Sequence, residues 1–148
     1  MNSNPMQAGR TILVSLSMLA ATAFAQGGPV DPAALTWKTL PNGVSIAVFM
    51  GDPTRPGPYA SRAKLPPNLR IPPHTHPEDG RTTTVIAGTL YWAFGETFDA
   101  AKLRAFGPGS VIVEPRGVAH FAMAGEEGAE LQTNSTGPAG MTFLEPAK

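Results

Sequence analysis

The sequence predicts an all-β fold, a sandwich or barrel assembled from many short strands. The chain of 148 residues is 42% hydrophobic and contains 16 Gly and 16 Pro without any periodic spacing. This combination is typical of apolar strands separated by tight turns. Segments rich in β-branched and aromatic residues recur at intervals of roughly 8–12 residues, which is the spacing expected of such folds.

The predicted strands follow one another from residue 44 to residue 144, most of them next to Gly, Pro or Asn. They are Val44–Met50, Tyr59–Leu65, Arg70–His76, Thr82–Ala87, Thr89–Phe94, Val111–Glu114, His120–Ala124, Ala129–Asn134 and Met141–Leu144. Gly88 is expected to separate two of these strands. Phe98–Ala105 is the one segment that favours a helical turn.

The first 25 residues have the pattern of a secretory signal peptide. Arg10 carries their only charged side chain, Thr11–Ala20 is a short apolar run, and Ala23–Ala25 is a small-x-small cleavage site. The apolar run is shorter than the roughly 20 residues that span a membrane. We therefore expect cleavage after Ala25, a single mature domain of residues 26–148, and a periplasmic or secreted protein that is not attached to a membrane.

The composition argues against several functions. The 11 Lys+Arg residues balance the 11 Asp+Glu residues, so nucleic acid is not an expected partner. The chain has no cysteine, which excludes disulfides, iron–sulfur clusters and thiolate metal sites. Any bound metal must therefore be held by nitrogen or oxygen atoms.

Three histidines carry the main chemical signal. His74 and His76 are separated by one residue, so in an extended segment their side chains project from the same face. His120 begins another predicted strand. Neutral imidazole is the commonest metal ligand and suits Fe, Cu and Zn. The histidines are either ligands of one divalent transition metal or scattered structural residues, depending on whether the fold brings them together.

The residues around the histidines resemble the two sequence signatures of the cupin family. The matching positions are His74, His76 and Gly88 in the first signature, and Gly109, Pro115, Gly117 and His120 in the second. The resemblance covers about residues 36–146. Within the family, the chain is similar to small exported bacterial cupins and to the metal-binding domain of a zinc-dependent anti-sigma factor.

The resemblance implies a cupin jelly-roll β-barrel, also called a double-stranded β-helix, with a metal held inside by the three histidines. It also implies a fourth ligand, a glutamate, at the position that Arg81 occupies here. Arginine stays protonated and offers no lone pair. The nearest acids, Glu78 and Asp79, lie in the preceding loop, and Glu78 is the alternative candidate for the missing ligand.

Two further residues are candidate catalytic residues. At the mouth of a barrel, Arg81 would bind a carboxylate or another anion beside the metal. Alternatively, it points to solvent or pairs with Glu78 or Asp79. Gln132 lies in an apolar predicted strand, where it either faces the barrel as a weak ligand or supporting partner, or is a polar residue of an edge strand.

A metal held by three neutral imidazoles keeps its full charge and at least one open coordination position, which favours anionic substrates and catalysis. Three-His cupins include iron thiol dioxygenases. The sequence therefore predicts a metal-dependent oxidoreductase, of dioxygenase type or with copper-dependent oxidative chemistry, that acts on a small anionic, polyhydroxy or saccharide substrate. The alternative is a non-catalytic periplasmic module that senses a metal or a ligand.

The side chains of the predicted strand that begins at His120 alternate between two faces, and this alternation is relevant to the oligomeric state. His120 and Ala122 share one face, and Phe121 and Met123 share the other. If His120 faces the metal, Phe121 and Met123 face another sheet or a second subunit. A homodimer is therefore expected.

Overall fold

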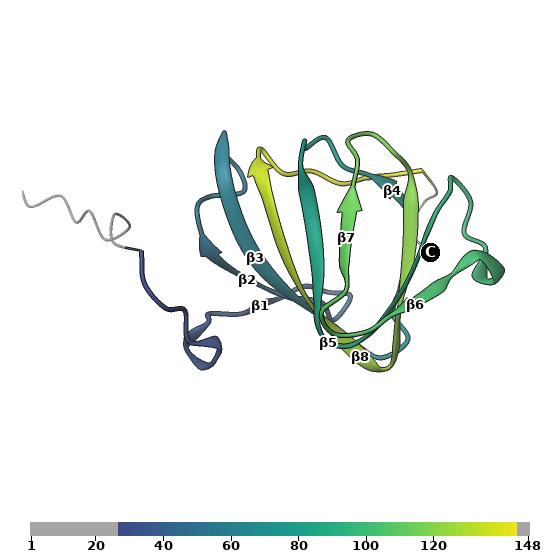
Figure 1. Cartoon of the computed structure of the whole chain (residues 1–148), viewed down its shortest axis with the longest axis horizontal. Helices are drawn as coiled ribbons and strands as arrows, with labels where there is room; N and C mark the ends of the chain where they lie inside the picture. The colour runs from purple at the N-terminus through teal and green to yellow at the C-terminus, as the bar shows by residue number, and fades with distance from the viewer. Residues whose placement is uncertain (1–26, 145–148) are drawn as a thin grey trace, which may run out of the picture.

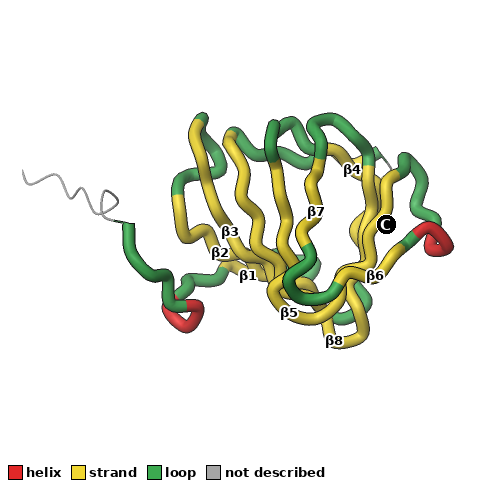
Figure 2. Tube along the Cα trace, in the orientation of Figure 1, coloured by secondary structure: helices red, strands yellow, loops and turns green. Residues whose placement is uncertain are grey.

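A computed structural model describes residues 27–144, which form one nine-stranded sheet and two 3-10 turns. The expected signal peptide lies outside the described residues. All the strand pairings in this part of the chain are antiparallel. Figure 2 shows that strands make up most of the fold and that the helical turns are short. The elements are η1 (Pro32–Ala34), β1 (Lys38–Thr39), β2 (Ser45–Met50), β3 (Gly57–Leu65), β4 (Arg70–Thr75), β5 (Arg81–Phe94), η2 (Ala100–Lys102), β6 (Arg104–Phe106), β7 (Val111–Glu114), β8 (His120–Gly137) and β9 (Thr142–Phe143).

The long strands β5 and β8 form the frame of the molecule. They pair with each other in two stretches, and the register shifts at two points of β5 between Val85 and Leu90. Gly88 lies in this region with φ of 70°, and a side chain there would collide with the carbonyl oxygen of Gly128. The expectation that Gly88 ends a strand is therefore wrong, because the strand bends at a bulge and continues.

The bends curl the sheet around an interior (Figure 1). Strand β3 pairs with the second half of β8, whereas β4 pairs with its first half. The two strands predicted between residues 120 and 134 are thus one strand whose halves have different neighbours. The predicted all-β barrel is confirmed as a curled jelly-roll sheet.

One end of this interior, the core end, is filled by a cluster of buried aliphatic side chains near the bends of β5 and β8. Its members are Val44, Leu65, Val85, Leu90, Ile112, Ala122, Ala124, Ala129 and Leu131. Valine, leucine and isoleucine alternate inward along the strands, and their burial stabilises the fold by about 1.5–3 kcal/mol for each fully buried side chain.

Two local expectations are refined by the structure. The segment expected to favour a helical turn contains η2 and then β6. Phe121 is fully buried, and its ring lies 5.0 Å from that of Phe98 in the same chain. Phe121 points away from the face that carries His120, but other residues of the same chain already bury it. A second subunit is therefore not needed to cover its side chain. Within the described residues, no helix is long and apolar enough to cross a membrane.

Candidate metal centre

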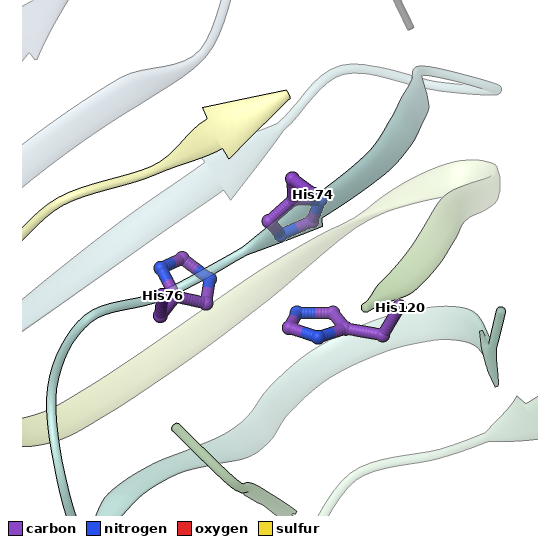
Figure 3. Close-up of side chains that lie close together, drawn as sticks. All are labelled: His74, His76 and His120. Atoms are coloured by element: carbon purple, nitrogen blue, oxygen red, sulfur yellow. The ribbon is translucent and has the colours of Figure 1, made fainter. Parts of the chain in front are cut away.

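The three histidines converge at the opposite end of the interior, which we call the metal end. One ring nitrogen from each lies within 4.8 Å of the corresponding nitrogens of the other two. His74 and His120 are direct partners across β4 and β8, and His76 follows β4. Figure 3 shows the three imidazoles turned toward one another. The sequence prediction that these residues meet at one point is confirmed.

Each imidazole is oriented by a backbone carbonyl. The Nδ1 atoms lie 2.8 Å from Pro72 O for His74, 2.6 Å from Gly140 O for His76 and 3.1 Å from Val118 O for His120. A carbonyl oxygen only accepts hydrogen bonds, so we assign the proton of each neutral ring to Nδ1. The Nε2 lone pairs remain free to bind a metal, which is the usual arrangement of metal-ligating histidines.

Burial keeps these imidazoles neutral. All three side chains are at most 4% exposed. Burial lowers the pKa of His74 to about 4 and is also the main cause of the lowered pKa values of His76 and His120. Neutral imidazole is the form that ligates metals, so the donor set fits a divalent transition metal at neutral pH.

A fourth group, Glu114 at the end of β7, was not singled out from the sequence. Its Oε2 lies 3.3 Å from His76 Nε2 and 3.5 Å from His120 Nε2. The signal for it was present, since Glu114 follows Ile112 by two residues and therefore shares the inward face of a predicted strand. A carboxylate on an otherwise apolar inward face indicates that a positively charged group, a hydrogen-bond donor or a metal ion lies in the interior.

Arg81 binds carboxylates of its own chain. Its Nε donates to Glu114 Oε2 at 2.7 Å, and its Nη1 donates to Tyr59 OH at 3.0 Å and to Glu78 Oε1 at 3.3 Å. The pairing with Glu78 considered from the sequence is present, whereas Asp79 pairs with Arg116. Burial alone would raise the pKa of Glu114, but the charge and hydrogen bonds of its neighbours outweigh this and lower it.

Glu78 lies behind His76 rather than at the Nε2 side of the cluster. Its Oε2 is 3.9 Å from His76 Nδ1, the nitrogen that also contacts the Gly140 carbonyl. This Oε2 atom is buried and has no hydrogen-bond partner among the described residues. The structure therefore brings Glu78 next to a ligand candidate but does not bring it to the metal position.

Gln132 is not brought to the histidines. Its side chain accepts a hydrogen bond of 3.3 Å from Arg62 Nε, while the neighbouring Leu131 and Thr133 are the buried residues of this stretch. Adjacent residues of a strand point to opposite faces, so Gln132 faces away from the interior. The expectation that it faces the barrel is corrected, and the edge-strand description does not apply either, because β8 is paired on both sides here.

Aromatic side chains border the metal end. The Trp92 ring lies 5.4 Å from that of His120, and the Phe143 ring lies 5.8 Å from that of His74. Phe94 packs edge-on against Trp92 at 4.5 Å and is 50% exposed. These rings place apolar surface beside the polar histidine cluster.

A curled antiparallel sheet with three convergent histidines inside it is a β-barrel architecture whose donor set is suited to a metal ion. The chain belongs to the cupin family, since the family model described as Cupin matches residues 57–143.

Relatives of known sequence and structure agree with this assignment. Germin-like protein 4-1 of Oryza sativa subsp. japonica is 33% identical over 109 residues, which are 69% of this chain and 37% of that protein. The chain thus spans only about four tenths of the length of the curated relatives it matches.

Solved structures share the fold at low identity. The polyketide cyclase RemF from Streptomyces resistomycificus has a TM-score of 0.63 at 18% identity, covering 82% of this chain and 89% of that one. A recombinant oxalate oxidase in complex with glycolate has a TM-score of 0.53 at 23% identity, covering 71% of this chain and 57% of that one.

Proposed function

We propose that this cupin is a metal-dependent oxidoreductase that binds one divalent transition metal, Fe, Cu or Zn, and acts on a small anionic or polyhydroxy molecule. The observation that carries the proposal is that three atoms, all of them hydrogen-bond acceptors, lie next to one another. The free Nε2 atoms of His76 and His120 face the same carboxylate oxygen of Glu114, at 3.3 and 3.5 Å. With the protons on Nδ1, no hydrogen atom lies between these atoms, so a cation is needed to hold them together.

The bound metal would supply Lewis-acid or redox chemistry at the end of the barrel. The chain's own residues do the rest: backbone carbonyls fix the histidines, and the rings of Trp92, Phe94 and Phe143 lie beside them. The similarity to a germin-like protein, and the shared fold with an oxalate oxidase that binds glycolate, support small carboxylates as the first substrates to test.

The test combines metal analysis with oxygen consumption. The full chain is produced without affinity histidines in an exporting bacterial host, beside a His120→Ala variant. We expect about one Fe, Cu or Zn ion per wild-type chain, and oxygen uptake with oxalate, glycolate or a sugar when the ion is Fe or Cu, since Zn has no redox chemistry. Both are expected to be lost in the variant. Absence of metal from the wild type, even after reconstitution, would overturn the proposal.

A second proposal is a non-catalytic metal-sensing module, for which the resemblance to an anti-sigma metal-binding domain provides the precedent. The presence of Glu114 beside the histidines favours it, because four protein ligands around zinc are typical of a closed, non-catalytic site. Stoichiometric zinc with no turnover across carboxylates and sugars would favour this proposal over the oxidoreductase.

We further propose that the protein is exported to the periplasm or secreted after cleavage following Ala25, and that it acts as a homodimer without nucleic-acid or membrane partners. The amino-terminal sequence and the mass of the product recovered from the exporting host test these points. A product that starts elsewhere or remains a monomer at micromolar concentration would contradict them.

A further inference from the structure

The position that cupins reserve for a ligand glutamate is Arg81 in this chain, yet a carboxylate is present beside it. Arg81 on β5 and Glu114 on β7 are direct partners in the antiparallel register. Side chains of such partners leave the sheet on the same face, with Cβ atoms about 4.5–5.5 Å apart. A carboxylate on either strand therefore reaches the same region of the interior.

We propose that Glu114 is the fourth metal ligand, supplied from β7 in place of β5, and that Arg81 is a positioning residue that holds it. The inference deepens the proposed function and rests on it. Two adjacent ligands of one divalent metal, each about 2.0–2.2 Å from the ion, lie about 2.8–3.6 Å from one another for ligand–metal–ligand angles of about 90–109°. The distances from Glu114 Oε2 to His76 Nε2 and His120 Nε2 are 3.3 and 3.5 Å.

The contacts of Glu114 leave it able to bind a metal. Arg81 Nε donates one hydrogen bond of 2.7 Å to its Oε2, which has a further lone pair for an ion. Arg81 also bonds Glu78 and Tyr59, so the guanidinium is fixed from behind. Such a support fixes the direction in which a ligand points, as outer partners of metal ligands generally do.

The charges of the cluster also call for a cation. Glu78 and Glu114 carry two formal negative charges, and Arg81 carries one positive charge, so the buried network is one positive charge short. The Glu78 side chain is 0% exposed, and its Oε2 has no hydrogen-bond partner among the described residues. A buried, uncompensated negative charge is costly, and a divalent ion beside Glu114 would neutralise it and leave a net charge of plus one for an anionic ligand to balance.

This assignment changes the expected role of Arg81. Its Nε and Nη1 atoms are bonded to Glu114, Glu78 and Tyr59, so they are not available to a substrate. With a divalent ion bound, the cluster carries a net charge of plus one. An anionic substrate would therefore be attracted by the metal itself, and the Nε and Nη1 donors of Arg81 would not take part.

The experiment compares Glu114→Gln with Glu78→Gln, a matched control in which the same atom change is made on the other carboxylate bonded to Arg81. Full-length apo proteins are titrated with Co²⁺ against a chelator, and the visible absorption of the bound ion reports its ligands. We expect the Glu114 variant to bind Co²⁺ at least about 100-fold more weakly than wild type, with a changed spectrum. The Glu78 variant is expected to lose about 10-fold or less and to keep the wild-type spectrum.

Arg81→Gln tests the positioning role by the same two readouts. We expect weaker binding and an altered spectrum while the three histidines remain in place. If Glu114→Gln fails to fold, judged by its far-ultraviolet circular dichroism, Glu114→Asp replaces it. That change keeps the charge and withdraws the oxygen by one methylene group, and it is expected to weaken binding about 10-fold or more and to alter the spectrum.

The outcomes separate the two proposals. Wild-type affinity and spectrum in a folded Glu114 variant would overturn the fourth ligand while leaving the three-histidine metal site intact. An unchanged spectrum and affinity in Arg81→Gln would overturn the positioning role. If the wild-type protein binds no Co²⁺, Fe, Cu or Zn at all, both the proposed function and this inference fail.

Discussion

The two ends of the interior are made by the same strands but hold opposite kinds of side chain. A step of two residues along a strand, from the core end to the metal end, replaces an apolar residue by a polar one. The pairs are Val85 and Thr83, Ile112 and Glu114, Ala122 and His120, and Leu131 and Thr133, all of them buried. One backbone frame therefore serves both ends, and the side chains alone decide what each end does.

This difference separates stability from chemistry. At the core end, burial of aliphatic groups stabilises the fold without any cost of desolvating polar atoms. At the metal end, buried imidazoles and carboxylates lose their hydration, and the proposed metal would offset part of that loss. Four changes test this division, ordered by the size of their expected effect on the free energy of unfolding.

The largest effect is expected from Leu90→Ala at the core end. Leu90 is only 2% exposed, and its truncation leaves a cavity among packed neighbours. We expect a loss of about 2–5 kcal/mol in the free energy of unfolding of the apo protein, measured by urea denaturation. The Co²⁺ affinity of the folded variant is expected to stay within about threefold of wild type. A parallel loss of metal affinity would show that the two ends are not independent.

The second effect is metal-dependent stabilisation at the metal end. A free metal concentration of 100 times the dissociation constant is expected to raise the free energy of unfolding by about 2.7 kcal/mol. His120→Ala removes a ligand and should abolish this increment, whereas Leu90→Ala should keep it. Thermal unfolding with metal and with chelator measures both. An equal increment in the His120 variant would place the stabilising ion elsewhere.

The third effect is a loss of stability at low pH, which should come from the buried histidines of the metal end. The folded pKa of His74 is about 4, against an ordinary value of 6.5, so the unfolded chain takes up a proton first as the pH falls. Stability from this residue is therefore complete above pH 6.5 and is lost as the pH falls toward 4. Between pH 7 and pH 5, His74 alone should lower the free energy of unfolding of the apo protein by about 2 kcal/mol.

Urea titrations of the apo protein at a series of pH values measure this loss. His74→Gln, a neutral residue that does not titrate, should flatten the dependence. A wild-type protein as stable at pH 5 as at pH 7 would show that the buried imidazoles accept protons as readily as exposed ones do.

The smallest effect is expected at Gln132, which contacts Arg62 on the outer face of the sheet. Gln132→Ala should change the free energy of unfolding by about 0.5 kcal/mol or less. Its Co²⁺ spectrum and oxygen uptake should match those of wild type. A loss of metal binding or turnover in this variant would restore the catalytic role that the sequence suggested for Gln132.

Local pattern was enough to place most of the strand segments and to predict that His74 and His76 project from the same face, because both follow from alternation along a few residues. It did not show that β5 and β8 are each one continuous strand. It was not enough for Gln132. Along β8 the inward residues include Ala122 and Ala124, but beyond the bend they are Leu131 and Thr133. The bend between the two stretches shifts the alternation by one residue, and no short window of sequence reports that shift.

Glu114 was missed for a different reason. It lies 33 residues from Arg81 in the chain and meets it only through the register of β5 and β7. The family pattern directed attention to one position on β5 and to the acids next to it in sequence. Cross-strand neighbours depend on tertiary pairing, which the sequence of either strand alone does not specify.

The carbonyl of Gly140 that orients His76 belongs to the segment after β8, and the following strand β9 pairs with β4 beside His74. If the proposed metal is bound, cleavage of the chain in this segment would remove the carbonyl that orients His76 and would weaken metal binding without removing any ligand. A loss of metal would then report damage to a part of the chain that does not itself touch the ion.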